Sequence, residues 1–269
     1  MSGICEYSDK WFFKPERKKR VTLRLFCFPF GGGGASFYRT WVKDLPQEVE
    51  LCAVRLPGRE GRFREVAFTR LTPLVETLAA IFERCSDLPF AFFGHSMGAW
   101  IGFELARQLR RENQRSPIHL FVSGRRAPQT ENPDPINPDL PRCEFIDKVR
   151  SYNGTPELIF QDPELLELFL PILRADFAML ETYQYKEEHP VECPITVFGG
   201  LQDGRVGQED LEAWREQTSA KFRMKMFPGD HFYLKDAREE LLTEIGRDLK
   251  SYLNFEEARV YARCNENSR

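Results

Sequence analysis

The sequence predicts an α/β fold, in which helices cover both faces of a mostly parallel β-sheet. Short apolar stretches with strand character alternate along most of the chain with stretches whose apolar residues recur at helical spacing. That alternation is typical of a parallel sheet, because each parallel strand needs a crossover connection to the next. The second observation is a serine flanked by glycines directly after a fully apolar strand. A chain of 269 residues is long enough to bury the core of such a fold.

The predicted elements begin with a strand over 23–28, which stops at Pro29 because proline cannot donate to a strand ladder. A glycine run and a helical stretch over about 37–45 follow. Further strands are predicted over 49–56, 89–93, 118–123, 194–198 and 222–227. Further helices are predicted over 71–82, 100–109, 210–218 and 239–253.

The alternation breaks between about Arg125 and Glu192. Five prolines punctuate the beginning of this stretch, and helical patterns over 164–170 and 173–183 follow without an obvious strand. Insertions after the carboxyl end of a strand lie where open α/β sheets bind ligands, so we expect a helical lid over about 125–192. A simple connector is the alternative. The domain is predicted to cover 21–253, with tails over 1–20 and 254–269.

Charge and cysteine content exclude several classes of protein. Lys and Arg total 38 against 41 Asp and Glu, a net charge of −3, which argues against a bulk electrostatic grip on nucleic acid or an anionic membrane. The apolar runs are far shorter than the roughly 18 residues of a membrane span, and the first residues lack an apolar secretion signal. Seven cysteines without a C-x-x-C pair favour free thiols over a disulfide framework or a zinc site. We therefore expect a cytoplasmic protein.

A G-x-S-x-G motif, Gly94-His95-Ser96-Met97-Gly98, links the strand over 89–93 to the following helix. In this context the glycines let neighbouring backbone approach, and the serine hydroxyl projects above the sheet. Amide groups and the helix dipole favour a developing anion there. Ser96 is therefore the predicted nucleophile, and the arrangement is typical of the α/β-hydrolase fold. A buried serine that caps the helix is the alternative.

A serine hydroxyl needs a general base, and the chain has four histidines. His95 lies inside the motif, with its side chain expected to point away from Ser96, and His119 lies on a strand as a core or face residue. His189 precedes a proline after the insertion. His231 follows the strand over 222–227, at the sheet edge where Ser96 also projects. His231 is the predicted base.

The imidazole needs a carboxylate to fix its tautomer. In this architecture the order along the chain is serine, acid, histidine. Asp203 follows the strand over 194–198 at the same sheet edge and is the predicted acid. Asp210 is better placed to cap the next helix. Asp230 would have to fold back on the adjacent His231, so it is the runner-up.

Two backbone amides are expected to form an oxyanion hole. One is predicted at Met97, the residue after the nucleophile, and the other in the glycine run after the first strand, at Phe30 or Gly31. Glycines let that loop turn its N–H groups toward a substrate. A nucleotide-binding loop is the rival interpretation, but no Gly-Lys-Ser/Thr follows, and Ser36 stands where a dinucleotide fingerprint has glycine.

Five segments carry a resemblance to a known family: LFCFPFGGG at 25–33, LPGRE at 56–60, FGHSMGA at 93–99, LRAD at 173–176 and GDHFY at 229–233. In this order they are similar to type II thioesterases, the stand-alone editing hydrolases of nonribosomal peptide and polyketide assembly lines. They also resemble the medium-chain thioesterase that acts with animal fatty acid synthase. The resemblance spans about residues 23–253, and plain esterases lack its LPGRE and RADF segments.

The resemblance implies hydrolysis of an acyl thioester on the phosphopantetheine arm of an acyl or peptidyl carrier protein, through a covalent acyl-enzyme. The carrier protein would be the partner, aberrant acyl groups of a synthase would be the substrates, and neither a cofactor nor a metal is expected. A monomer is the default expectation. The residues that the family carries over are the nucleophile Ser96, the acid Asp203, the base His231, and oxyanion amides at Met97 and near Gly31.

Several alternatives stay open at this point. Medium-chain acyl release from a fatty acid synthase, acyl transfer and oxygen-ester hydrolysis would use the same triad, whereas a non-catalytic acyl binder would have lost it. Asp230 stands where relatives commonly have glycine, which keeps it open as the acid. Apolar residues of the insertion either line an acyl path or pack the lid onto the core: Phe160, Leu166, Phe169, Leu170, Phe177 and Leu180.

Two further features are expected to lie outside the reaction itself. The LPGRE segment and Asp176 are distinctive of the family, and we expect them to support the fold rather than react. The basic run Lys14–Arg20 is expected to be a solvated tail, with contact to an acidic carrier protein as the alternative.

Overall fold

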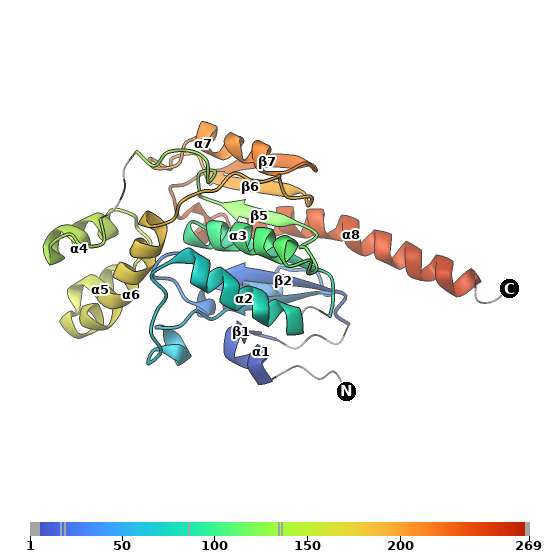
Figure 1. Ribbon diagram of the computed structural model, residues 1–269, viewed down its shortest axis with the longest axis horizontal. Coiled ribbons are helices and arrows are strands. Elements are labelled where there is room, and N and C mark those ends of the chain that lie inside the picture. The colour runs from blue at the N-terminus through green and yellow to red at the C-terminus, as the bar shows by residue number, and fades with distance from the viewer. Residues whose placement is uncertain are drawn as a thin grey trace.

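A seven-stranded sheet forms the centre of the described chain, and helices cover both of its faces (Figure 1). The structure is a computed structural model that describes residues 6–16, 18, 20–85, 87–133, 135 and 137–266. The strands lie in the order β1-β3-β2-β4-β5-β6-β7, and all neighbours are parallel except β1 and β3. Their bounds are β1 Phe12–Phe13, β2 Leu23–Phe28, β3 Val49–Val54, β4 Phe90–His95, β5 Leu120–Ser123, β6 Ile195–Gly200 and β7 Phe222–Phe227. This confirms the predicted α/β fold with a mostly parallel sheet.

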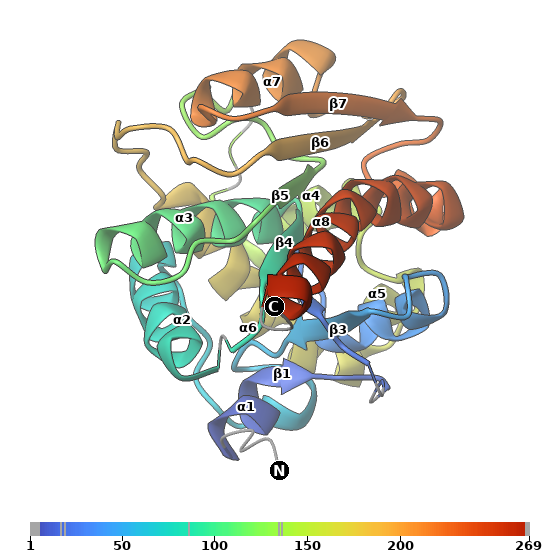
Figure 2. The same ribbon diagram turned by 90° about the vertical axis from the view of Figure 1, so that its right-hand side faces the viewer.

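Apolar side chains fill a core on each side of the sheet. Phe90 and Phe92 of β4 belong to one core, whereas Ala91 and Phe93 belong to the other, because successive strand residues face opposite ways. A strand that is buried on both faces is therefore apolar at every position. The first face is covered by α2 (Leu71–Cys85), α3 (Met97–Arg111) and α7 (Gln208–Glu212), and the second by the 3-10 helix η1 (Ala35–Lys43) and α8 (Arg238–Glu266) (Figure 2).

Most predicted elements are present, and the differences lie in helix type and continuity. The helix predicted over 37–45 is the 3-10 helix η1, and that predicted over 210–218 is α7 followed by a 3-10 helix over Ala213–Gln217. The two helices predicted over 164–170 and 173–183 are one helix, α6 (Pro163–Glu181). Pro171 lies inside α6, where it removes one backbone hydrogen bond without ending the helix.

The first residues described are not the predicted tail. A short helix, α1 (Glu6–Trp11), leads into β1, which pairs antiparallel with β3 at the edge of the sheet. The physical reason is the burial of the aromatic side chains of Trp11 and Phe12. Within the basic run, Lys14 forms an ion pair with Glu50 at 2.9 Å. Positions 17 and 19 of that run lie outside the described residues.

The C-terminal segment also differs from the predicted tail over 254–269. Helix α8 continues to Glu266 and projects past the end of the sheet (Figure 1). Residues 254–266 contain neither glycine nor proline, the strongest helix breakers, and Asn254 by itself does not end the helix. Positions 267–269 lie outside the described residues. Within the described part of the chain, every helix is too short or too polar to span a membrane.

The predicted helical insertion lies between β5 and β6. It contains α4 (Arg142–Arg150), α5 (Glu157–Gln161) and α6, which lie together beyond one end of the sheet (Figure 1). These helices share a small core of their own, formed by Phe145, Val149, Leu170, Leu173 and Phe177. Positions 134 and 136 of the predicted lid lie outside the described residues.

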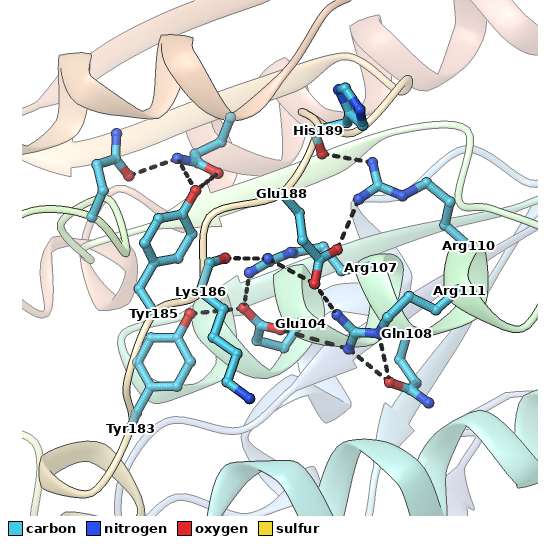
Figure 3. Close-up of polar contacts among 12 residues, drawn as sticks. Glu104, Arg107, Gln108, Arg110, Arg111, Tyr183, Tyr185, Lys186, Glu188 and His189 are labelled. Carbon is cyan, nitrogen blue, oxygen red and sulfur yellow. Dashed lines mark hydrogen bonds and ion pairs between the residues drawn. The ribbon is translucent and has the colours of Figure 1, made fainter.

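The connector that leaves the insertion is fixed to α3 by a polar cluster (Figure 3). Arg107, buried on α3, donates to Glu104 at 2.5 Å and to the carbonyl oxygen of Lys186 in the connector. The carboxylate of Glu188 accepts from Arg111 at 2.5 Å. The end of the insertion is therefore tied to the helix that begins at the G-x-S-x-G motif.

The buried residue His119 is expected to make the stability of the protein depend on pH. Its Nε2 lies 2.9 Å from the hydroxyl of Thr196, as expected for a satisfied core histidine. Burial lowers the pKa of His119 to about 4, although the nearby Asp248 acts in the opposite direction. An unfolded histidine keeps a pKa of about 6.5. Between these two values the unfolded state binds a proton that the folded state does not, so stability falls as pH falls.

We expect this residue to lower the free energy of unfolding by about 2 kcal/mol between about pH 7 and about pH 5. Urea unfolding of wild type and of His119→Gln at the two pH values would measure how much of the change in the free energy of unfolding comes from His119. His189 is exposed, so His189→Gln is the matched control and should keep the wild-type difference. An unchanged pH dependence in His119→Gln would contradict the prediction.

Candidate active site

Ser96 occupies a sharp turn between β4 and α3. Its backbone φ of 52° and ψ of −115° lie outside the regions that L-residues ordinarily adopt. Such strain persists only where the surrounding structure imposes it, and it is common at functional sites. The N–H of Ser96 donates to the carbonyl oxygen of Ser123 at 2.8 Å, which fixes the turn against β5. The turn places Ser96 at the N-terminus of α3, where the motif predicted a nucleophile.

Close backbone contacts explain the two glycines of the motif. A Cβ atom on Gly94 would lie 2.0 Å from the carbonyl oxygen of Gly98. A Cβ atom on Gly98 would lie 2.3 Å from the carbonyl oxygen of Phe28 in β2. Both obstacles are backbone atoms, so a larger residue could be accommodated only by moving α3 or β2.

We expect Gly98→Ala to destabilise the protein by about 2 kcal/mol, because the added methyl group forces α3 away from β2. The same displacement should slow the reaction of Ser96 with a fluorophosphonate. Thermal unfolding and the labelling rate measure the two effects. Gly61→Ala is the control, since a Cβ atom there meets nothing within 4 Å. Wild-type stability and labelling in Gly98→Ala would refute the steric argument.

His231 and Asp203 lie together beyond the ends of β7 and β6. Nδ1 of His231 is 2.7 Å from Oδ2 of Asp203. The other oxygen, Oδ1, accepts from the backbone N–H groups of Arg205 at 2.9 Å and Val206 at 3.3 Å. Burial by itself would raise the pKa of Asp203, but the hydrogen bond and charge of His231, together with these N–H groups, outweigh burial and lower it. A carboxylate on Nδ1 leaves Nε2 as the proton acceptor.

The runner-up acid, Asp230, makes other contacts. Its Oδ1 accepts from the backbone N–H of Phe232 at 2.8 Å, and its Oδ2 accepts from the side chain of Asn153 at 3.2 Å. Nε2 of His231 is buried and has no hydrogen-bond partner among the described residues. The geometry therefore favours Asp203 over Asp230 as the partner of the imidazole and leaves Nε2 available.

A second buried imidazole lies beside this pair. The ring centres of His95 and His231 are 5.0 Å apart. Nδ1 of His95 is 2.9 Å from the hydroxyl of Ser123, which is 2.7 Å from the hydroxyl of Tyr233. Burial, and then the charge of His231, lower the pKa of His95 well below its ordinary value, so His95 is neutral at neutral pH. Sequence reasoning missed this network, because its members come from three separate segments.

Ser96 and His231 line one cavity beneath the inserted helices. From α4, α6 and the loop after α4, its wall contains Val149, Tyr152, Gly154, Thr155, Leu173, Phe177, Leu180 and Glu181. Two of the six apolar residues singled out in the insertion, Phe177 and Leu180, line this cavity. Leu170, Phe160 and Phe169 pack in the small core of the insertion. Phe177 and Leu180 also pack in that small core, so these two residues combine cavity lining with lid packing, and Leu166 is buried.

The glycine run after β2 forms a tight turn at the same cavity. The N–H of Gly33 donates to the carbonyl oxygen of Phe30 at 2.9 Å, and Gly32 has a φ of +73°. Gly31 lies in the cavity wall. Met97 is fully buried as the first residue of α3. The structure thus brings the loop predicted to donate an oxyanion amide to the cavity that the predicted nucleophile lines.

The LPGRE segment supports this loop from the outside. The carboxylate of Glu60 accepts from the backbone N–H groups of Ala35 at 3.0 Å and Ser36 at 2.9 Å. A Cβ atom on Gly34 would lie 2.3 Å from the same carboxylate. The segment therefore has the supporting role expected of it.

No metal-binding cluster is evident in the described part of the chain, where the free thiol of Cys143 is exposed and three others are buried. No group of three or more His, Cys, Asp or Glu residues there could hold a metal ion. The thiols of Cys27, Cys52 and Cys193 are free and buried. Burial raises the pKa of Cys52 and of Cys193 to about 12, so these thiols are protonated at neutral pH.

Known proteins are similar to this chain in sequence and in structure. The thioesterase domain model matches residues 23–249. The gramicidin S biosynthesis protein GrsT of Aneurinibacillus migulanus is 47% identical over 245 residues, covering 91% of this chain and 96% of GrsT. The medium-chain S-acyl fatty acid synthase thioesterase of Homo sapiens is 33% identical over 231 residues, covering 84% of this chain and 86% of that protein. The type II thioesterase BorB, from the borrelidin biosynthetic cluster, superposes with a TM-score of 0.80 at 33% identity, covering 88% of this chain and 96% of BorB.

Proposed function

The chain belongs to the thioesterase domain family, and from this premise we propose that it hydrolyses acyl thioesters on the phosphopantetheine arm of an acyl or peptidyl carrier protein. Its role would be to remove aberrant acyl groups from a nonribosomal peptide or polyketide synthase. The observation that carries the proposal is that Ser96 and His231 line one cavity, with Asp203 2.7 Å from the imidazole. The names of GrsT and BorB, which refer to biosynthesis, support the pathway.

In the proposed mechanism, Nε2 of His231 takes the proton of Ser96 as its hydroxyl oxygen attacks the thioester carbonyl. The backbone amides of Met97 and of Phe30 or Gly31 hold the oxyanion. The imidazolium returns the proton to the departing pantetheine thiol, and an acyl-enzyme remains. Water, deprotonated by the same nitrogen, then attacks the acyl-enzyme, and the imidazolium returns this proton to the oxygen of Ser96 as the acid is released.

The inserted helices have a distinct place in this mechanism. Phe177 and Leu180 of α6 line the cavity beside the polar groups, so they can contact the acyl chain of a bound substrate. We expect the insertion to act as a lid over the bound acyl chain.

We take the enzyme to act as a monomer in a reducing cytoplasm, an assignment that suits its free buried thiols.

A panel of acyl carrier protein thioesters, from acetyl to dodecanoyl, tests the proposal. Wild-type enzyme is expected to release free acid from carrier thioesters and to prefer short acyl groups, as editing requires. Oxygen esters of the same acyl groups are expected to be poorer substrates. Failure of correctly folded enzyme to release acid from any carrier thioester would refute the proposal.

Medium-chain acyl release from a fatty acid synthase is the second candidate. The observation that favours it is the 33% identity to the human medium-chain enzyme. A rate maximum at medium chain length in the same panel would select it over editing. Adding an alcohol or amine as a competing nucleophile separates hydrolysis from acyl transfer, since a transferase would form an ester or amide in place of free acid.

A further inference from the structure

We propose that Asp176, on the lid helix α6, and Arg59, in the LPGRE segment, are a positioning pair that holds the oxyanion loop in its working conformation. The pair makes the geometry of the oxyanion hole depend on the placement of the lid. This inference rests on the proposed function, because it assigns the pair a role in stabilising the oxyanion of acyl transfer to Ser96.

The contacts of Asp176 join three distant parts of the chain. Its carboxylate is completely buried and accepts from Arg59 twice, at 2.6 Å on Oδ1 and 2.9 Å on Oδ2. Oδ2 also accepts from the backbone N–H of Gly32 at 2.7 Å. Arg59 in turn donates to the carbonyl oxygen of Gly33 at 3.0 Å. The pair therefore binds the loop at two successive residues, accepting from the N–H of Gly32 and donating to the carbonyl oxygen of Gly33.

The contact with Gly32 selects one of two turn conformations. Phe30 to Gly33 form a β-turn closed by the hydrogen bond between its ends, and the positive φ of Gly32 is typical of the third residue of a type II turn. Types I and II differ mainly by a flip of the central peptide, here Gly31–Gly32. In a type I turn the N–H of Gly32 would point away from Asp176, so the carboxylate stabilises the type II form.

The lid helix also touches this turn directly. A Cβ atom on Gly32 would lie 2.7 Å from Cδ2 of Leu173, which is on α6 one turn before Asp176. Gly31, which precedes the gripped N–H, lies in the wall of the cavity. A displacement of α6 would therefore move the loop from which an oxyanion amide is expected.

Arg59 has an additional electrostatic role. A buried carboxylate close to the oxyanion site would oppose a developing negative charge unless a cation neutralised it. Arg59 supplies that charge at bidentate geometry, with only 6% of its side chain exposed. Removing Arg59 alone leaves the negative charge uncompensated, whereas removing both charges does not. A pair that served stability alone would show no such asymmetry in catalysis.

The test compares Asp176→Asn, Arg59→Gln and the double variant, with a carrier thioester and with a p-nitrophenyl ester. In Asp176→Asn we expect kcat to fall about 10- to 100-fold on both substrates, with KM within about 3-fold, because an oxyanion donor loses its fixed position. Arg59→Gln should be slower than Asp176→Asn, and the double variant should be faster than Arg59→Gln. Glu50→Gln is the matched control, since it weakens another buried ion pair, that with Arg24 near the first residues of β2 and β3, far from the loop, and should keep kcat within about 2-fold.

Two results would overturn the inference: a loss of kcat in Asp176→Asn no larger than in the control, or a double variant no faster than Arg59→Gln. If Asp176→Asn does not fold, Arg59→Gln decides by itself, and a folded Arg59→Gln enzyme with wild-type kcat refutes the inference. The two substrates separate this outcome from the proposed function. If the wild-type enzyme hydrolyses the p-nitrophenyl ester but not the carrier thioester, the proposed function is refuted. The role of the positioning pair is then tested by comparing the variants on the ester alone.

Discussion

Ser96→Ala is expected to lower kcat for carrier-thioester hydrolysis by about 10⁴- to 10⁶-fold. The hydroxyl is the proposed nucleophile, and alanine cannot form the acyl-enzyme. The reaction that remains would be direct attack by water, helped only by the oxyanion amides and substrate binding. Steady-state hydrolysis gives the magnitude, and mass spectrometry of the rapidly quenched enzyme should detect an acyl adduct on wild type and none on the variant.

The matched control for this experiment is Ser251→Ala. Ser251 is exposed on α8, and its hydroxyl donates to the carbonyl oxygen of Asp248 at 2.7 Å. Its loss should leave both the rate and the acyl adduct unchanged. Hydrolysis by Ser96→Ala within about 10-fold of wild type would show that another group or a bound water attacks the thioester, and would remove Ser96 from the mechanism.

The predicted site could be assembled from the sequence because its members follow local rules. The G-x-S-x-G motif is short, and its two glycines are required by close backbone contacts with Gly98 and Phe28. Asp203 and His231 come after strands, and carboxyl ends of parallel strands share one edge of a sheet. The position of a residue can thus be predicted from the sequence alone when it belongs to a continuous motif or follows a strand of a repeating topology.

The side-chain contacts that hold the site together could not be predicted in the same way. Arg59 and Asp176 are 117 residues apart, and their pairing depends on how the insertion packs on the sheet. The family resemblance marked both residues as distinctive, but the spacing of residues has no information about side chains that meet across the fold. The hydrogen bonds of the Ser123 hydroxyl with His95 and with Tyr233 were missed for the same reason.

The differences in secondary structure have a related origin. Pro171 predicts a break in a helix from local rules, whereas packing of α6 on the lid core keeps the helix continuous. Strand β1 is two residues long, too short for an alternating pattern to be visible. Its place in the sheet is determined by the burial of Trp11 and Phe12, a tertiary effect.

Asp203→Asn is expected to lower kcat by about 10⁴-fold, whereas Asp230→Asn should change it by less than about 3-fold. Asparagine at 203 can donate to Nδ1 of His231, which would place the proton on Nε2. The imidazole could then no longer accept the proton of Ser96. Asp230 makes its contacts with Phe232 and Asn153, so its neutralisation leaves the tautomer of His231 unchanged.

The pH profile distinguishes this loss from a simple change in the acidity of the site. The lowered pKa of Asp203 keeps its carboxylate ionised at every pH above its ordinary range near 4, so protonation of Asp203 does not limit the wild-type rate near neutrality. Asp203→Asn should therefore depress kcat by a similar factor from about pH 6 to about pH 9, without recovery at either end. Recovery of the wild-type rate at high pH would mean that Asp203 acts only through its charge. A larger loss in Asp230→Asn than in Asp203→Asn would instead transfer the role of the acid to Asp230, and the 2.7 Å contact between Asp203 and His231 would then be structural.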